Sequence, residues 1–430
     1  MTRSTAEVSH VEQPPSPDQA TMRVPLPPEL TARQCPFDPP QALATMHDRA
    51  PVNQVKLGNG EVIWLITGMS EARAVLADPR FSADRFTRPN SLISVPPEMR
   101  EKMFDARARA GQFITMDAPE HTRLRKLVIG QFTLRRMRAL IPHITEIVDT
   151  HLDAMADAGT SADLVSAFAL PVPSLVICEL LGVPYEARAD FQRRTAALLR
   201  MDTGLEEVLR VREEMRGFMH ELVTAKRAQP DDDLISGLIH GDHAGELTDD
   251  ELVGIANLLL VAGHETTANM IGLGVFALLE HPDQLELLRS DPEVTDKAVE
   301  ELLRYLSIVH LGPTRIAVED VQVGDELIPA GGTVMISTPE INRDSAYWDD
   351  PAALDLTRAR NPHLAFGHGI HQCLGQQLAR AEMTVALPAL VRRFPHLRLA
   401  CRPEDVPLRD NMFVYGVHSL PVAWDSPEDV

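Results

Sequence analysis

The sequence predicts a mainly α-helical protein with small β-sheets, folded as one domain around a long central helix. Helical patterns dominate from Ala42 onward, because apolar residues recur at the spacing of one helix face. The segment from Thr248 to Pro282 runs without a breaker for about 32 residues, or roughly 48 Å of helix. Alternating β-branched residues between His310 and Ile336 predict a few short strands. No change of composition marks a linker within 41–430, so this span is expected to be a single catalytic domain.

The composition restricts the class of protein. Hydrophobic residues make up 44% of the 430 residues, which is ample for a large core, and the formal net charge of −21 makes nucleic acid and anionic membranes poor partners. No apolar run approaches the roughly 18–20 residues that span a membrane, and no signal peptide is recognised. The four cysteines show no paired spacing, which indicates the reducing cytoplasm rather than a disulfide framework.

Taken in order, the elements begin with residues 1–40, whose nine prolines predict a disordered or surface-lying arm. A strand is expected at 61–66, and a hairpin around the Gly324-Asp325 turn. Pro388 lies inside the helix that follows Cys373, where proline costs about 3 kcal/mol, so this helix is expected to kink or end early. Further helices are expected around 70–77, 121–128, 140–156 and 205–228.

The long central helix contains an unusual sequence in its middle. Thr248 and Glu251 form a capping-box pattern at its start, and Pro282 ends it. Its interior holds Ala262-Gly263-His264-Glu265-Thr266-Thr267, although glycine costs about 1 kcal/mol in a helix and threonine can bend one. A local rule broken in this way often marks a functional site. The alternative is a helix bent only for packing.

One cysteine has a distinctive setting, in Phe366-Gly367-His368-Gly369-Ile370-His371-Gln372-Cys373-Leu374-Gly375. The residues after it are good helix formers, so Cys373 lies near a helix N-terminus, where negative charge is favoured. A thiolate there binds soft metals or iron. Zinc and iron–sulfur sites need several ligands, so a lone cysteine suits a metal held by another scaffold, such as haem. The alternative is a buried structural cysteine.

The loop resembles the cysteine loop of the cytochrome P450 superfamily, Phe-x-x-Gly-x-x-x-Cys-x-Gly, at every defined position. The resemblance covers roughly residues 40–420 and is strongest to soluble bacterial members of the actinomycete type. It implies the P450 fold, haem b (iron protoporphyrin IX) as cofactor, and Cys373 as axial ligand of the iron, with Gly369 in the same haem-binding loop.

The interior of the long helix resembles the oxygen-activation motif of that superfamily. The resemblance places Ala262 and Gly263 against the haem, where the glycine leaves room for dioxygen. It makes Glu265 and Thr266 the catalytic residues. Thr266 would hydrogen-bond the activated oxygen, and Glu265 would help to relay protons.

Three further groups of residues match superfamily positions. Glu301 and Arg304 resemble the Glu-x-x-Arg pair, whose buried triad Arg358 would complete, although Leu354 stands where the family often has an aromatic residue. Four residues match ligands of the haem propionates, to which arginine pairs strongly: His121, Arg125, Arg315 and His371. The substrate pocket is expected at Phe86, Ile93, Phe113, Leu259, Ala262, Val309, His310, Met412 and Phe413.

The implied function is insertion of one oxygen atom from O2 into a C–H or C=C bond of a small lipophilic molecule, such as a macrolide, polyketide or terpenoid. Electrons would come from NAD(P)H through ferredoxin reductase and ferredoxin, and the protein is expected to be a cytoplasmic monomer. The basic stretch 121–145, which has no Asp or Glu, is the expected ferredoxin-docking face. It could also be a solvated helix face.

Two other functions use the same loop. A peroxide-driven peroxygenase typically lacks the acid–threonine pair, and a non-enzymatic haem sensor or carrier does not need it. The presence of Glu265 and Thr266 therefore favours the monooxygenase.

Overall fold

The structure, a computed structural model, describes residues 26–88, 90–93, 95, 100–101, 103–359 and 361–425. Its helices are α1 (Gln41–Arg49), α2 (Met69–Ala77), α4 (Ala106–Arg109), α5 (Glu120–Ile129), α6 (Leu134–Ala158), α7 (Pro171–Leu181), α8 (Arg188–Leu199), α9 (Leu205–Ala228), α10 (Leu234–His240), α11 (Asp249–Glu280), α12 (Pro282–Ser290), α13 (Thr295–Leu306), α14 (Thr338–Ile341) and α15 (Gln376–Arg393). Its strands are β1 (Val52–Lys56), β2 (Val62–Ile66), β3 (Phe81–Ser82), β4 (Ser161–Asp163), β5 (Thr314–Ala317), β6 (Val321–Val323), β7 (Glu326–Ile328), β8 (Thr333–Ile336), β9 (Arg398–Leu399) and β10 (Pro421–Ala423). The mainly α character predicted from the sequence is confirmed.

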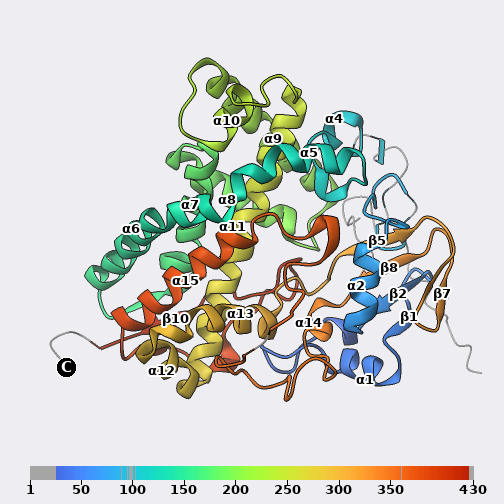
Figure 1. Cartoon of the computed structure of the whole chain (residues 1–430). Coiled ribbons are helices and arrows are strands. Elements are labelled where there is room, and N and C mark those ends of the chain that lie inside the picture. Colours follow the sequence, from blue (N-terminus) through green and yellow to red (C-terminus); the bar gives the residue numbers. More distant parts are fainter. Residues whose placement is uncertain are drawn as a thin grey trace, which may run out of the picture.

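The long central helix is α11, with 32 residues. Thr248 is its N-cap, and both hydrogen bonds of the capping box with Glu251 are present. Figure 1 shows α11 passing through the middle of the molecule, with α10 beyond one end and α12 at the other. The predicted start and end of this helix are confirmed.

The core forms around α11, which contacts α7, α9, α13 and α15. Most side chains of α11 are buried, including Leu260, Leu273 and Phe276. Helix α15 also packs along α6, and the two lie together on the side of the molecule away from the main sheet (Figure 1). Burial on nearly all sides of α11 explains why its sequence shows no polar face.

A five-stranded sheet, ordered β1-β2-β8-β5-β3, forms the other side of the molecule together with α1 and α2. The expected strand at 61–66 is β2, which pairs antiparallel with β1 and parallel with β8. The expected hairpin is β6–β7, which closes between Val323 and Glu326. A smaller sheet, β4-β10-β9, joins the C-terminal part of the chain to the end of α6.

Of the two outcomes expected at Pro388, a kink or an early end, the early end is wrong, because α15 continues through Pro388 to Arg393. Pro388 itself and its neighbours Leu387, Leu390 and Val391 are buried. Burial of this face against α6 stabilises the helix enough to offset the backbone hydrogen bond that proline cannot make. Helix α6 likewise begins at Leu134, earlier than expected, and continues through Pro142.

Of the predicted N-terminal arm, residues 1–25 lie outside the described part of the chain. Residues 26–40 pack against the domain, and Phe37 is buried with its ring 4.9 Å from that of Phe276. The guanidinium of Arg33 lies 3.9 Å over the ring of Tyr415, whose hydroxyl donates to the Pro36 carbonyl. Within the described residues, no helix combines the length and apolar composition needed to cross a membrane.

Candidate functional site

The cysteine loop is shaped by two glycines and the start of α15. Gly367 and Gly369 have φ values of +70° and +73°, and a Cβ on Gly369 would lie 2.4 Å from the Leu76 carbonyl of α2. Only glycine fits this approach. The Cys373 N–H donates to the Phe366 carbonyl at 2.8 Å, which closes the loop directly before α15.

Burial raises the pKa of the Cys373 thiol, while backbone N–H groups of Gly375 and Gln376 and the charges of Arg125 and Arg380 oppose that rise. The N–H groups at the start of α15 therefore favour the thiolate, as the sequence predicts. Their effect on the thiol pKa is smaller than that of burial. A metal ion bound at sulfur deprotonates a coordinating thiol outright. Cys373 also retains exposed surface, as do Gly369 and Ile370 in the same loop.

The four predicted propionate ligands do come together. The His121 and His371 rings lie 4.2 Å apart, and Arg125 donates to the Gln372 carbonyl at 2.5 Å. Burial and the neighbouring arginines lower the pKa of His121, and lower that of His371 to about 3. His121 is 1% exposed, and neither of its ring nitrogens has a hydrogen-bond partner among the described residues.

A fifth residue, Arg85, belongs to this cluster and was missed from the sequence. Burial lowers the pKa of Arg315 to about 10, and the positive charge of Arg85 contributes to this shift. Arg85 follows β3, which pairs with β5, the strand that carries Arg315. No short motif surrounds Arg85, so only the strand pairing reveals it.

The charges in this cluster do not balance within the described residues. Three guanidinium groups, from Arg85, Arg125 and Arg315, face one carboxylate, Asp117, which already accepts hydrogen bonds from Ser82 and Ala83. With both imidazoles neutral, two positive charges remain. The two propionates of haem match this excess.

The middle of α11 has exposed surface only locally. Ala262 is exposed although most of the helix around it is buried. Ala262 and the cysteine loop therefore both retain exposed surface. The donor set, the unpartnered imidazole and the charge excess together fit a haem.

Thr266 and Gly263 lie beside Ala262. The Thr266 hydroxyl donates to the Ala262 carbonyl at 2.7 Å, the back-bond expected of a helix interior threonine. A Cβ on Gly263 would lie 2.8 Å from the side chain of Ile177 on α7. Close packing of α7 on α11 is thus one reason for glycine at this position.

Glu265 is held in a buried ion pair. It is 3% exposed and pairs with Arg409, whose Nη2 lies 2.9 Å from Oε2, and Asn269 donates to its backbone carbonyl at 2.7 Å. The buried His264 places Nε2 3.8 Å from the other carboxylate oxygen. Arg409 was missed from the sequence, because it lies 144 positions away with no pattern to link it.

A second buried acid joins α15 to α11. Burial raises the pKa of Glu382 to about 8, although a hydrogen bond from Thr267 lowers it. Its Oε2 has no partner among the described residues. A carboxyl group in this setting stays protonated at neutral pH.

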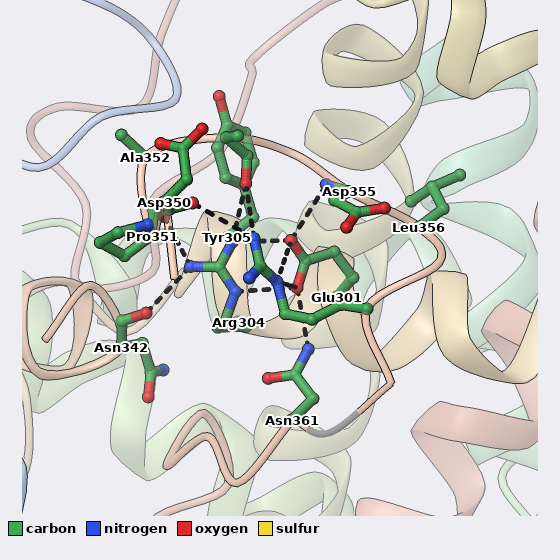
Figure 2. Close-up of polar contacts among 12 residues, drawn as sticks. Glu301, Arg304, Tyr305, Asn342, Asp350, Pro351, Ala352, Asp355, Leu356 and Asn361 are labelled. Carbon is green, nitrogen blue, oxygen red and sulfur yellow. Dashed lines mark hydrogen bonds and ion pairs between the residues drawn. The ribbon is translucent and has the colours of Figure 1, made fainter. Parts of the chain in front are cut away.

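The predicted triad is present around Glu301, as Figure 2 shows. Arg304 makes a bidentate pair with Glu301 at 2.7 and 2.8 Å, and both residues are 0% exposed. Arg358 Nε lies 3.1 Å from Glu301 Oε2, and Asn361 donates to the same oxygen at 2.9 Å. Arg304 also donates to the carbonyls of Asn342, Pro351 and Ala353. Leu354 is buried nearby, so the missing aromatic leaves the triad intact.

The predicted pocket residues lie in several environments. The ring of Phe86 stacks on Phe104 at 4.5 Å, and Leu259 and Phe113 are buried. His310 is hydrogen-bonded to the backbone, because its Nε2 lies 2.8 Å from the Met412 carbonyl oxygen. Burial, with Arg33 nearby, lowers the pKa of His310 to about 4, so it is a neutral donor to that carbonyl.

The remaining pocket residues differ in exposure. Val309 and Phe413 are half-buried and Met412 is buried. Ile93 closes a turn, with its N–H bonded to the Asn90 carbonyl.

The basic stretch lies on α5 and the start of α6, and its members differ. Arg123 pairs with Glu251 of α11 and Arg136 donates to Gln131. Lys126, Arg135 and Arg138 are exposed. Of these charges only that of Arg123 is neutralised by an acid among the described residues, since Gln131 is an uncharged amide.

Comparison with known proteins gives a consistent result. The family model described as Cytochrome P450 matches residues 60–422. Cytochrome P450 105C1 from a Streptomyces species is 50% identical over 394 residues, which are 92% of this chain and 97% of that protein.

Solved structures match over nearly the whole chain as well. Rif16 in complex with R-L is 55% identical with a TM-score of 0.82, covering 93% of this chain and 100% of that one. CYP105P1 in complex with filipin I is 44% identical with a TM-score of 0.86, covering 92% and 98%.

Proposed function

The chain belongs to the cytochrome P450 family, and on this basis we propose which residues do the chemistry and on what kind of substrate. It is a P450 monooxygenase, an oxidoreductase with a haem-thiolate iron cofactor. The proposal is that the cofactor is haem b, with Cys373 as axial ligand. The observation that carries it is the position of Cys373, in a loop closed on the Phe366 carbonyl directly before α15 and beside an uncompensated cation cluster, of which Arg125 bonds the Gln372 carbonyl.

In the proposed site, Arg85, Arg125, Arg315, His121 and His371 hold the two haem carboxylates. Arginine is suited to this task because its planar donors pair with both carboxylate oxygens. When bound, the haem supplies the iron at which dioxygen is reduced and from which one oxygen atom passes to the substrate.

Thr266 and Glu265 would handle protons at the proposed cofactor site. The Thr266 hydroxyl can turn from the Ala262 carbonyl to donate toward the dioxygen site, since a back-bond of this kind is weak. The Glu265 carboxylate must leave Arg409 before it can take up and deliver a proton there. The small side chain of the exposed Ala262 would keep the helix surface low at the proposed cofactor site, whereas Gly263 faces α7.

The proposed substrate is a small lipophilic specialised metabolite, which is hydroxylated or epoxidised. Apolar residues from separate elements would line its pocket, among them Phe86, Leu259, Val309 and Met412. CYP105P1, a structural relative, was solved in complex with filipin I, and this supports a small-molecule substrate.

The proposed electron donors are a ferredoxin and its reductase, fed by NAD(P)H, and the protein would work in the cytoplasm as a monomer. The exposed Lys126, Arg135 and Arg138 are the proposed docking cations, because opposite charges speed association of redox partners.

The spectrum of the reduced carbon-monoxide complex tests the cysteine assignment. A thiolate ligand gives a strongly red-shifted Soret band, so wild type should show that band and Cys373→Ser should lack it. Cys401→Ser, a half-buried cysteine far along the chain, is the matched control and should retain it. Retention of the band in Cys373→Ser would remove Cys373 from the site.

Turnover with two oxidants separates the monooxygenase from its alternatives. With ferredoxin, reductase and O2, the proposed enzyme forms product faster than with hydrogen peroxide alone. A peroxygenase would show the reverse order, and a haem carrier would form product in neither assay.

A further inference from the structure

A second carboxylate network lies directly beside the Glu301 triad. Glu300 receives a bidentate pair from Arg380 of α15, with Nε at 2.5 Å from Oε1 and Nη2 at 3.0 Å from Oε2. His363 Nε2 lies 3.0 Å from the same Oε2. Burial raises the pKa of Glu300, but the hydrogen bonds from His363 and Arg380 bring it down to about 2, so the carboxylate is charged.

The hydrogen bonds of His363 fix its tautomer. The Ala365 N–H donates to Nδ1 at 3.2 Å, so Nδ1 carries no proton and Nε2–H donates to Glu300. Glu300 thus binds the segment that enters the cysteine loop as well as the helix that leaves it.

Arg380 contacts the cysteine loop on both sides. Its guanidinium carbon lies 4.6 Å from the centroid of the Phe366 ring, and the Phe366 carbonyl accepts the Cys373 N–H. Its Nη1 donates to the Gln376 side chain at 3.0 Å, and Gln376 is the third residue after Cys373, at the start of α15. The guanidinium is therefore connected to Cys373 through the residues before and after it.

We propose that Arg380, anchored by Glu300 and His363, is a positioning residue for Cys373. It fixes the loop that aims the sulfur, and its guanidinium places a positive charge beside that loop. This inference rests on the proposed role of Cys373 as axial ligand. Groups around a metal-bound sulfur tune both the affinity for the metal and its reduction potential.

Charge and geometry make separate predictions. A nearby positive charge favours the reduced, more negative iron–thiolate centre, so its removal in Arg380→Gln should move the reduction potential to a more negative value. Loss of the bidentate anchor should also loosen the loop, and conversion of the reduced carbon-monoxide complex to a form without the red-shifted band should be about tenfold faster or more. Arg380→Lys keeps the charge but not the planar pair, so its potential should stay near wild type while conversion remains fast.

The matched control is Arg392→Gln. Arg392 is an exposed arginine on the same helix, with a single hydrogen bond to the Arg289 carbonyl, so its loss removes one charge from α15 without touching the loop. Potential and conversion rate should both stay at wild-type values.

The measurements are a spectroelectrochemical titration of the haem and the rate of spectral conversion, made on the haem-loaded full chain. A wild-type potential and rate in Arg380→Gln would overturn the proposal, even if thermal stability falls, because a purely structural residue would behave that way. An equal shift in Arg392→Gln would also overturn it.

Where Arg380→Gln yields no haem protein, Glu300→Gln decides, since it keeps Arg380 and removes only its anchor. Faster conversion supports the proposal and a wild-type rate overturns it. A wild type without the red-shifted band would instead overturn the Cys373 assignment and this inference with it.

Discussion

The buried pair of Glu265 and Arg409 determines how the proposed proton-delivering acid can act. Both residues are largely buried, so removal of one partner leaves an uncompensated charge that costs about 3–5 kcal/mol. The pair also joins α11 to the segment that carries Met412 and Phe413, two proposed pocket residues.

We expect Arg409→Met to lower the free energy of unfolding by about 3–5 kcal/mol. Adding Glu265→Gln to that variant should restore part of the loss. Chemical denaturation of the single and double variants measures this. Arg402→Met, which breaks an exposed pair with Asp405, should change stability by less than about 1 kcal/mol. Equal losses at positions 402 and 409 would show that burial of the pair is unimportant.

The loss of folding stability at acid pH should depend on Glu300. Its folded pKa of about 2 lies below the unfolded value of 4.5, so its contribution is fully present above pH 4.5 and is lost as the pH falls toward 2. The contribution is at most about 3 kcal/mol. The difference in thermal midpoint between wild type and Glu300→Gln should therefore be largest above pH 4.5 and shrink below it. A constant difference across this range would contradict the assignment.

Residues within short motifs could be predicted from the sequence, and residues that contact those motifs from a distance could not. Arg304, Glu301 and Arg358 meet as expected, because the first two share a helix face and the third lies in a recognisable segment. Arg85 and Arg409 carry no local pattern. Their roles follow from a strand pairing and from a contact between α11 and a loop far along the chain.

Among the elements, α13 holds the loop between α14 and α15 in place. Arg304 alone donates to three of its carbonyls, at Asn342, Pro351 and Ala353, and Glu301 accepts the N–H of Asp355. The loop has little regular structure of its own (Figure 2), so these bonds substitute for a helix or strand ladder.

Glu301→Ala should therefore abolish haem incorporation rather than slow turnover, because Arg304 stays buried without its charge partner. The ratio of haem absorbance to protein measures this. Asp296→Ala, an acid on the same helix in its first turn, is the control and should incorporate haem normally. A haem-replete, soluble Glu301→Ala protein would contradict the expected role of the triad.

The helices that the sequence defines well are those with a capping signal or a clear apolar face. The starts of α9 and α11 were predicted for these reasons. The sequence misjudged α15 because the cost of Pro388 is a local quantity, whereas burial against α6 is a property of the assembled fold.

For the whole molecule, the formal net charge of −21 makes a local group of exposed, unpaired cations a distinctive feature. Reversing Lys126, Arg135 or Arg138 to Glu should slow the first electron transfer from ferredoxin, most clearly at low ionic strength, because exposed charges are screened over about 8 Å at physiological salt. Arg123 is a poor choice, since Glu251 already neutralises it.

The measurement is the reduction rate as a function of salt. Lys56→Glu on β1, an exposed lysine on the sheet at the other side of the molecule, is the control and should leave the curve unchanged. Overlapping curves for all the variants would place the docking face elsewhere.

The contact between the first and last described parts of the chain has a consequence for biosynthesis. Pro36 and Tyr415 are hydrogen-bonded although 379 positions separate them, and Arg33 lies on the same tyrosine ring. A ribosome releases the N-terminal segment first, so residues 33–37 leave the exit tunnel long before their docking partner has been made. That segment can find its place only when translation is almost finished, and until then it is a target for proteases and chaperones.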